Sequence, residues 1–306
     1  REIPALILQN NIYGLDIDHR CYQLASFALT MKGRAYHSRY LRKIVMPNVM
    51  ALQNIDRDTI EASGSWGQKS LMWQFENIDT IGSLLKITPE ECAAIRVEKG
   101  IFGYNQQILK TQAEYLSRKY HVVVTNPPYL GKGLGNELKA YVTKQYPNSK
   151  ADIMATFMER CYEMISDYGK YAMINMHSWM FLGSYEELRK SIIEHQKIDS
   201  LLHLGPRTFD EISGEVVQNA AFVISKSDCD IATEQLQHRN IAKKGTYFRL
   251  VDGNDSRNKE RMYFDALYRL QHKVNGVDKD PVYFENVCQW NFEKIPGYSF
   301  GYWVSN

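Results

Sequence analysis

Segments with the apolar pattern of strands alternate with segments typical of amphipathic helices along most of this 306-residue chain. Strand-like runs occur at residues 11–18, 122–125, 169–176, 197–205 and 219–226. Most of them are followed by stretches with apolar residues at three- and four-residue spacing. Alternation of this kind predicts right-handed strand–helix–strand units and a largely parallel sheet covered by helices. The sequence therefore predicts an α/β fold.

The alternation is interrupted by a polar stretch at about residues 47–70, which contains Gly64, Ser65 and Gly67. Glycine and serine between periodic segments are typical of loops. We interpret this stretch as an α-rich insertion. We predict that the sheet resumes with a strand at residues 71–75.

A second change begins near residue 227, where polar and charged residues replace the strand pattern. One helix is predicted beyond it, at about residues 256–273, ahead of an aromatic-rich ending that is too short to bury a core of its own. The sequence therefore predicts a core at residues 1–226 and an extension or linker at residues 227–306.

The composition is that of an ordinary globular protein, with 24% charged residues and a net charge of +2. No run approaches the roughly 18 apolar residues of a membrane helix, and the N-terminus has no signal-peptide pattern. Five cysteines are scattered singly, without the paired spacing of a zinc site or a disulfide framework. We therefore expect a cytoplasmic protein without membrane association or a bound metal.

One predicted strand stops abruptly. Val122 to Thr125 is typical of a buried strand, and it runs directly into Asn126, Pro127, Pro128 and Tyr129. Ligands of open parallel sheets bind outside the carboxyl ends of the strands, which is where these four residues are expected. The two prolines make the turn stiff, because proline fixes φ and has no N–H. A rigid loop without a chemical role is the simpler alternative.

This turn offers two acceptors beside a flat ring. The Asn126 side-chain oxygen and the Pro127 carbonyl accept hydrogen bonds, and Tyr129 supplies the ring. The combination suits a planar group bearing an NH₂, such as the exocyclic amine of adenine. Holding both amine hydrogens favours a pyramidal nitrogen with its lone pair aimed at an electrophile, so that proximity and orientation supply most of the catalysis. A base in a duplex would have to be flipped out to reach the turn.

Two acidic turns are candidates for binding a cofactor. Asp16 ends the first predicted strand, where doubly wound folds place a carboxylate that accepts hydrogen bonds from ribose hydroxyls. Asp79 follows the strand predicted at residues 71–75, where it could accept from the amine of a cofactor adenine. Each has a plain alternative: Asp16 as an exposed turn residue, and Asp79 as the start of a helix.

Together these positions resemble the N6-adenine DNA methyltransferases of the gamma motif order, which use S-adenosylmethionine. "IYGLDID" is similar to the family's ribose-binding turn, "ENIDTIGSL" to its adenine-binding turn and "NPPY" to its catalytic loop. The resemblance implies a Rossmann-like S-adenosylmethionine-dependent methyltransferase sheet, and no metal. It assigns catalysis to Asn126, Pro127, Pro128 and Tyr129, and cofactor binding to Asp16, Ile17, Asp79 and Asn126.

A further segment, "LHLGPRTFDEI", followed by "VVQNAAFVI", resembles the part of this family that stacks the flipped base. The resemblance implies that Phe209 stacks the base together with Tyr129. The alternative is that Phe209 is simply buried beneath its own loop.

Over nearly all 306 residues, the chain is similar to the large methyltransferase component of phage-defence systems, the BREX PglX type, and to type II restriction-modification methylases. "YPNSKADIMATFMERC" and "FEKIPGYSFGYWVS" carry this wider resemblance. It implies a longer parent protein that acts on double-stranded DNA, other components of a defence complex as partners, and a missing target-recognition domain beyond residues 227–306.

In this family a glycine-rich cofactor loop and its strand would precede Arg1. The resemblance therefore implies an N-terminally truncated core. We expect this chain alone to bind S-adenosylmethionine weakly or not at all and to be inactive.

The residues by themselves leave other functions open. RNA and protein-glutamine methyltransferases use similar loops on a planar amine or amide. A DNA-recognition or assembly module of a defence complex, in which methylation is secondary, belongs to another class. Adenine in DNA is favoured only by the resemblance.

Overall fold

The structure is a computed structural model. It describes residues 3–63, 73–100, 103–130, 133–209, 217–226, 243–272 and 282–304. The chain forms two compact units, Arg1–Arg118 and Lys119–Asn306, and each is described by itself. Within the described ranges, no helix combines the length and the apolar content that crossing a bilayer requires.

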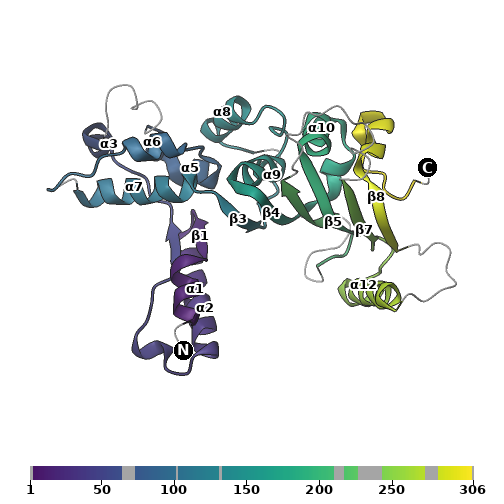
Figure 1. Ribbon diagram of the computed structural model, residues 1–306. Coiled ribbons are helices and arrows are strands. Elements are labelled where there is room, and N and C mark those ends of the chain that lie inside the picture. Colours follow the sequence, from purple (N-terminus) through teal and green to yellow (C-terminus); the bar gives the residue numbers. More distant parts are fainter. Residues whose placement is uncertain are drawn as a thin grey trace. The chain divides into compact units, whose positions relative to one another are not determined.

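The first unit combines helices with one small sheet (Figure 1). Strands β1 (Tyr13–Asp16) and β2 (Asn48–Ala51) pair in parallel, with Asp16 opposite Ala51. Its helices are α1 (Ile3–Asn10), α2 (His19–Tyr36), α3 (Arg57–Ser63), α5 (Ile78–Ile81), α6 (Pro89–Ala94) and α7 (Gly103–Ser117), with 3₁₀ turns at Tyr40–Arg42, Trp73–Asn77 and Gly82–Leu84.

Side-chain caps explain where α2 and α6 begin. Asp18 caps α2 by accepting a hydrogen bond from the Arg20 backbone N–H at 2.7 Å. Thr88 and Glu91 form a reciprocal capping box at α6, because each side chain bonds to the backbone N–H of the other. Caps of this kind each contribute about 1 kcal/mol to helix stability.

The second unit is built on a six-stranded sheet with the order β3-β4-β6-β5-β7-β8 (Figure 1). The strands are β3 (Tyr120–Thr125), β4 (Ile165–Met176), β5 (Gln196–Gly205), β6 (Asn219–Lys226), β7 (Lys244–Arg249) and β8 (Tyr283–Cys288). The pairings make β3, β4, β5 and β7 run in one direction, while β6 and β8 run in the other. The carboxyl ends of the four aligned strands therefore share one edge of the sheet.

In the described part of the unit, four helices accompany this sheet: α8 (Asn136–Gln145), α9 (Ile153–Met164), α10 (Glu186–His195) and α12 (Ser256–Gln271). Helix α9 packs against β3 and β4, and α10 packs against β5. On β7, Tyr247 belongs to the large core and its neighbour Phe248 to a smaller cluster with Ala266 of α12. Because successive side chains of a strand point to opposite faces, α12 covers the face of the sheet opposite the large core.

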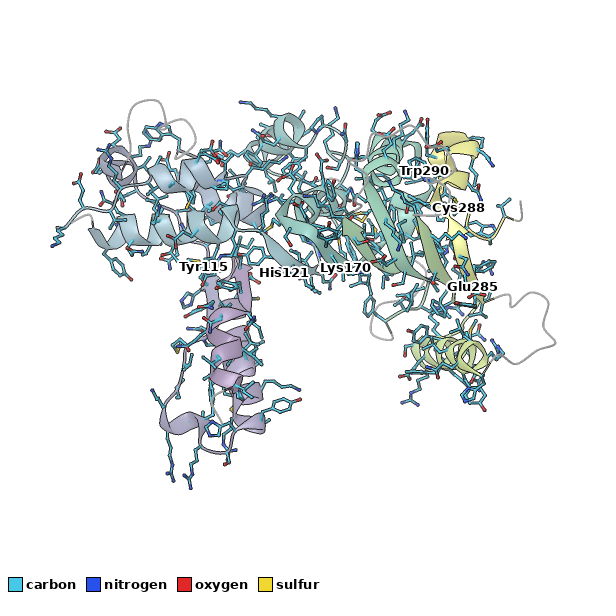
Figure 2. All side chains as sticks on the ribbon, viewed as in Figure 1. Tyr115, His121, Lys170, Glu285, Cys288 and Trp290 are labelled. Atoms are coloured by element: carbon cyan, nitrogen blue, oxygen red, sulfur yellow. The ribbon has the colours of Figure 1, made fainter. Side chains whose placement is uncertain are left out.

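The aromatic ending completes the large core. Phe292, Phe300 and Tyr302 are buried within it, and burial of an apolar side chain of this size contributes roughly 1.5–3 kcal/mol. Figure 2 places Cys288 on β8 and Trp290 just beyond it, where this ending starts. The ending thus packs on the sheet, in agreement with its being too short to bury a core of its own.

The predicted α/β fold is confirmed, but four local predictions were wrong. Part of the stretch interpreted as an insertion is strand β2. The strand predicted at residues 71–75 is a 3₁₀ helix from Trp73 onward, and residues 71 and 72 lie outside the described part. Strands β7 and β8 lie in the region where no strand pattern was recognised.

The fourth difference concerns β3, which was predicted to be buried. Val122 and Val124 are 62% and 73% exposed, because no described element packs on the face of β3 to which both side chains point. Val123, which points to the other face, packs against the large core. The core boundary predicted near residue 227 falls on residues 227–242, which lie outside the described part, and it stays a prediction.

Candidate functional site

The turn after β3 presents one polar side chain to solvent. Asn126 is exposed, whereas the next residue, Pro127, is buried, and Pro128 is exposed again. The buried proline, with its fixed φ, anchors the turn at the carboxyl end of β3. The Asn126 amide therefore stands outside the sheet, where an incoming group could reach it.

Tyr129 lies beside this amide. Its hydroxyl oxygen is 3.5 Å from Asn126 Oδ1 and 3.4 Å from the Ile174 carbonyl oxygen on β4. Both separations exceed the usual O–H···O distance of about 2.7–2.8 Å, so the ring is held mainly by packing against the large core. Burial raises the pKa of the Tyr129 phenol, which stays neutral near pH 7.

The first unit carries three of the four predicted cofactor residues, Asp16, Ile17 and Asp79, whereas Asn126 lies in the second unit. Asp16 ends β1, and its Oδ1 accepts a hydrogen bond from the Asp18 backbone N–H at 2.8 Å. Its backbone carbonyl accepts from the Leu52 N–H at 2.8 Å, which ties the ends of β1 and β2 together. The carboxylate is half-buried and keeps acceptor capacity on its second oxygen.

Ile17 and Asp79 belong to the same region of this unit. Ile17 is 54% exposed, and its methyl group lies close to Gly82, which has a φ of +63°. Asp79 is exposed in the first turn of α5, and its backbone N–H donates to Asn54 Oδ1 at 3.0 Å. The position of Asp79 in a helix start agrees with the plain alternative for this residue, and its part in cofactor binding stays a prediction.

These side chains match the chemical demands of a nucleoside. The Asp16 carboxylate is an acceptor for a diol, the exposed Ile17 side chain is an apolar face for a ring, and the exposed Asp79 carboxylate is an acceptor for an amine. In the described ranges, no three His, Cys, Asp or Glu side chains gather in a way that could hold an ion.

Phe209 follows β5, at the same edge of the sheet as the turn after β3. It is 39% exposed, so it is not the fully buried residue of the plain alternative. The turn before it is closed by a hydrogen bond from the Thr208 hydroxyl to the Gly205 carbonyl at 3.0 Å. Strands β4 and β6 lie between β3 and β5 in the sheet, and residues 210–216 lie outside the described part.

Sequence reasoning missed a chain of three polar rings at this edge. His177, the residue after β4, has its Nδ1 2.7 Å from Nε2 of His203 on β5. The other ring nitrogen of His203 is 3.0 Å from the Tyr302 hydroxyl. Burial, followed by the charges of His177, Arg249 and Lys259, lowers the pKa of His203 to about 3. His203 is therefore neutral near pH 7.

No sequence pattern links these three residues, because they come from β4, β5 and the C-terminal ending. The only available signal was that His177 and His203 each lie at the end of a predicted strand. Parallel strands bring such positions to one edge.

Comparison with known families gives one match that covers most of the chain. The family described as Eco57I restriction-modification methylase matches residues 10–209. A solved structure, that of the ATP-dependent Type ISP restriction-modification enzyme LlaBIII bound to DNA, superposes with a TM-score of 0.51 over 84% of this chain and 16% of that chain, at 14% identity. This second likeness concerns the fold.

Two curated relatives match the chain over its whole length. The adenine-specific methyltransferase BrxX of Escherichia coli O9:H4 (strain HS) is 34% identical over 350 aligned residues, and the adenine-specific methyltransferase PglX of Lacticaseibacillus casei (strain Zhang) is 34% identical over 331. The chain spans 27% and 26% of the lengths of these relatives.

Proposed function

Because the chain belongs to the Eco57I restriction-modification methylase family, we propose that it is the core of an adenine-N6 DNA methyltransferase that uses S-adenosylmethionine. The observation that carries this proposal is the exposed Asn126 amide at the carboxyl end of β3, on a turn anchored by the buried Pro127. It provides the acceptor that the chemistry needs.

In this proposal the second unit binds the target base. The Asn126 side-chain oxygen and the Pro127 carbonyl accept the two hydrogens of the adenine amine, with Pro128 keeping the turn stiff. The half-buried Tyr129 ring and the partly exposed Phe209 ring stack on the flipped base. These contacts orient the nitrogen lone pair, and orientation of two reactants contributes most of the rate enhancement.

The first unit binds the cofactor. Asp16 accepts hydrogen bonds from the ribose hydroxyls, Ile17 contacts the adenine ring, and Asp79 accepts from the cofactor's amine. S-adenosylmethionine, when bound, supplies an activated methyl group on a sulfonium. The support for this assignment is chemical. Asp16 and Ile17 at the end of β1, and Asp79 in the first turn of α5, provide an acceptor for the ribose, an apolar contact for the ring and an acceptor for the amine.

The wider context rests on the relatives. Both curated relatives are named as adenine-specific methyltransferases, and we propose that the full-length protein acts on double-stranded DNA in the cytoplasm as part of a restriction-modification or phage-defence system. Other components of that system are its expected partners.

An Asn126→Ala substitution tests the proposal in the full-length protein. Transfer of labelled methyl groups to plasmid DNA should fall at least about a hundredfold in kcat, as it does when one transition-state hydrogen bond is removed elsewhere. DNA binding and the circular dichroism spectrum should be unchanged, because the side chain is exposed.

Asn136→Ala, at the exposed start of α8, is the matched control and should keep full activity. The same assay with RNA and with protein as methyl acceptors decides between substrate classes. Retained DNA methylation in the Asn126→Ala protein would refute the role of this amide. Methylation of RNA or protein instead of DNA would refute the choice of substrate.

A further inference from the structure

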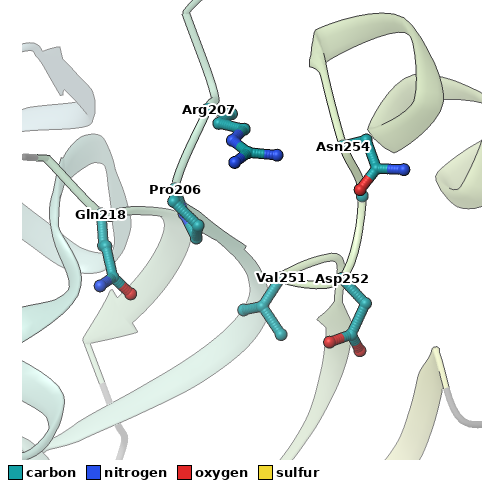
Figure 3. A pocket seen from close by; sticks show the side chains of 7 residues that line it. Pro206, Arg207, Gln218, Val251, Asp252 and Asn254 are labelled. Atoms are coloured by element: carbon teal, nitrogen blue, oxygen red, sulfur yellow. The ribbon is translucent and has the colours of Figure 1, made fainter. Parts of the chain in front are cut away.

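The second unit contains a pocket that none of the preceding assignments uses. Its volume is about 350 Å³. Figure 3 shows the lining residues, which come from three segments: Pro206 and Arg207 after β5, Gln218 before β6, and Val251, Asp252, Gly253 and Asn254 after β7.

Sheet topology brings these segments together. Strand β7 pairs in parallel with β5, so both end at the same edge, and β6 begins there because Asn219 pairs with Gly205. The Gln218 carbonyl also accepts a hydrogen bond from the His177 backbone N–H at 2.8 Å, which fixes the wall next to β4. The pocket thus lies outside the carboxyl ends of aligned strands, the usual place for a ligand in such sheets.

Arg207 is the most distinctive residue of the lining. Its φ of +57° is in the left-handed region, which is uncommon for a residue with a side chain. The guanidinium is exposed and, in the part of the chain that the structure describes, has no hydrogen-bond or ion-pair partner. In Figure 3 it extends toward the side of the pocket that carries Asn254.

A second cation lies beneath the pocket wall. Lys259 of α12 is buried, and its ammonium donates to the Leu204 and Leu250 carbonyls at 2.7 and 2.8 Å, at the ends of β5 and β7. The hydrocarbon part of Lys259 packs tightly against Gly253, since a Cβ at that glycine would approach the Lys259 Cγ to 2.6 Å.

The surrounding charges do not cancel. The Asp252 carboxylate, which lines the pocket, forms an ion pair with Arg249, and Asp255 caps α12 by accepting from the Asn258 N–H. Among the described residues, three cations, Arg207, Arg249 and Lys259, lie near these two carboxylates, which leaves one net positive charge in that set. Of these three cations, Arg207 alone has no hydrogen-bond or ion-pair partner in the described part of the chain.

The chemistry of the lining favours an anion over a base. Base pockets are lined by apolar and aromatic side chains that stack on the ring, whereas the apolar side chains in this lining are Pro206 and Val251 only. The other side chains are a guanidinium, a carboxylate and two amides. Guanidinium and amide N–H groups are the donors that bind phosphate oxygens in DNA complexes.

We propose that this pocket binds a backbone phosphodiester of the DNA strand next to the flipped adenine, with Arg207 as its main ligand and the Gln218 and Asn254 amides as further donors. The proposal rests on the proposed function. Arg207 precedes Phe209 by two residues, which span at most about 7 Å of chain. One nucleotide could therefore place its base on Phe209 and an adjoining phosphate at Arg207.

The test measures the binding of the full-length protein to fluorescent duplex DNA at several salt concentrations between about 50 and 200 mM. Arg207→Ala should weaken binding about tenfold at low salt, equally for all sequences, and reduce the slope of log K against log salt by about 0.9. The KM for DNA should rise by a similar factor, while kcat at saturating DNA should not change.

Asn254→Asp is a second, isosteric variant that places a negative charge in the pocket on an exposed residue. It should weaken binding several-fold even if Arg207→Ala disturbs the left-handed turn. Arg261→Ala, an exposed arginine of α12 outside the lining, is the control and should leave the slope unchanged.

Unchanged affinity and slope in both variants, together with normal DNA methylation, would overturn this proposal and leave the proposed function intact. Loss of binding to particular sequences only would overturn it in favour of base reading. Conversely, a reduced slope in a protein that methylates RNA or protein but not DNA would support the anion site while refuting the proposed function.

Discussion

Asn126 and His203 both lie at the carboxyl edge of the six-stranded sheet, but they differ in burial and in hydrogen bonding. Asn126 is exposed and uncharged, so its role depends only on where the turn holds it. His203, by contrast, is 5% exposed, bonded on both ring nitrogens, and held neutral by burial and by neighbouring cations. The Asn126 amide and the His203 ring therefore both stay uncharged near pH 7.

Neutrality of His203 has a consequence for acid stability. In the unfolded chain a histidine binds a proton below about pH 6.5, whereas in the folded protein His203 does so only below about pH 3. Between these values the unfolded state binds more protons, so the free energy of unfolding decreases as the pH falls, by up to about 1.4 kcal/mol per pH unit.

A His203→Gln substitution should therefore flatten the pH dependence of stability. Urea denaturation between about pH 6.5 and 4.5 should give a slope smaller than that of the unsubstituted protein by up to about 1.4 kcal/mol per pH unit. His195→Gln, at the exposed end of α10, is the control and should keep the original slope. An unchanged slope in the His203→Gln protein would show that this ring is accessible to protons in the folded state.

At the scale of elements, Arg189 of α10 connects three segments of the second unit. Its guanidinium is fully buried and donates to the carbonyls of Trp179, Leu182 and Gly297 at 2.6–2.9 Å. Gly297 belongs to the C-terminal ending, whose backbone turns there through a φ of +67°. Arg189 thus fixes the ending to the helix that packs on β5.

Arg189→Met should lower the free energy of unfolding by about 3 kcal/mol, because three carbonyls lose the charged donor that the buried guanidinium provides. Chemical denaturation measures this loss. The neighbouring Lys190→Met is the matched control: Lys190 forms ion pairs with Glu186 and Glu187 at the surface, and such pairs contribute at most about 1 kcal/mol. Equal losses in the two variants would contradict the anchoring role of Arg189.

The spacing of apolar residues predicted the helices and strands that have their own sequence pattern. It missed those whose position depends on pairing with other strands. Helix α9 and strands β4 and β5 have clear apolar patterns. Strand β7 does not show one, because both of its faces are covered: Tyr247 and Phe248 are adjacent and both buried. The direction of β6 was also unpredictable from the pattern, since β6 enters between β4 and β5 and runs against both.

The same distinction between local sequence patterns and strand pairing applies to the candidate site and the pocket. The turn from Asn126 to Tyr129 could be predicted because proline and strand signals are adjacent in the sequence. The pocket at Arg207 could not, because Asn254 reaches it only through the pairing of β5 with β7, which are separated along the chain by β6. A single sequence contains no pattern that predicts pairing between strands that are not consecutive along the chain.

For the whole molecule, the proposed roles place cofactor binding in one compact unit and binding of the target base in the other. Asp16, Ile17 and Asp79 lie in the unit that ends at Arg118, whereas Asn126 and Phe209 lie in the unit that begins at Lys119. Each group has hydrogen-bond partners within its own unit: Asp16 bonds to Asp18, and the turn before Phe209 is closed onto Gly205. Cofactor and DNA binding should therefore respond to separate substitutions.

Asp16→Asn should raise the KM for S-adenosylmethionine about tenfold and leave the KM for DNA unchanged, because the amide accepts one ribose hydroxyl less strongly than the carboxylate does. Arg207→Ala should raise the KM for DNA and leave the KM for S-adenosylmethionine unchanged. The double variant should show the sum of the two free-energy changes to within about 0.5 kcal/mol, as expected for sites without shared partners. Steady-state kinetics of methyl transfer to plasmid DNA, with each substrate varied in turn, measures all three proteins.

The control for these three variants is Asp58→Asn, which should change neither KM. Asp58 is an exposed residue of α3 in the same unit as Asp16. Equal KM values for the cofactor in the Asp16→Asn and the unsubstituted protein would remove Asp16 from the cofactor site. A double variant that departs from the sum by more than about 1 kcal/mol would mean that the two binding sites are energetically coupled. The division of binding between the two units would then be wrong, even if each single assignment held.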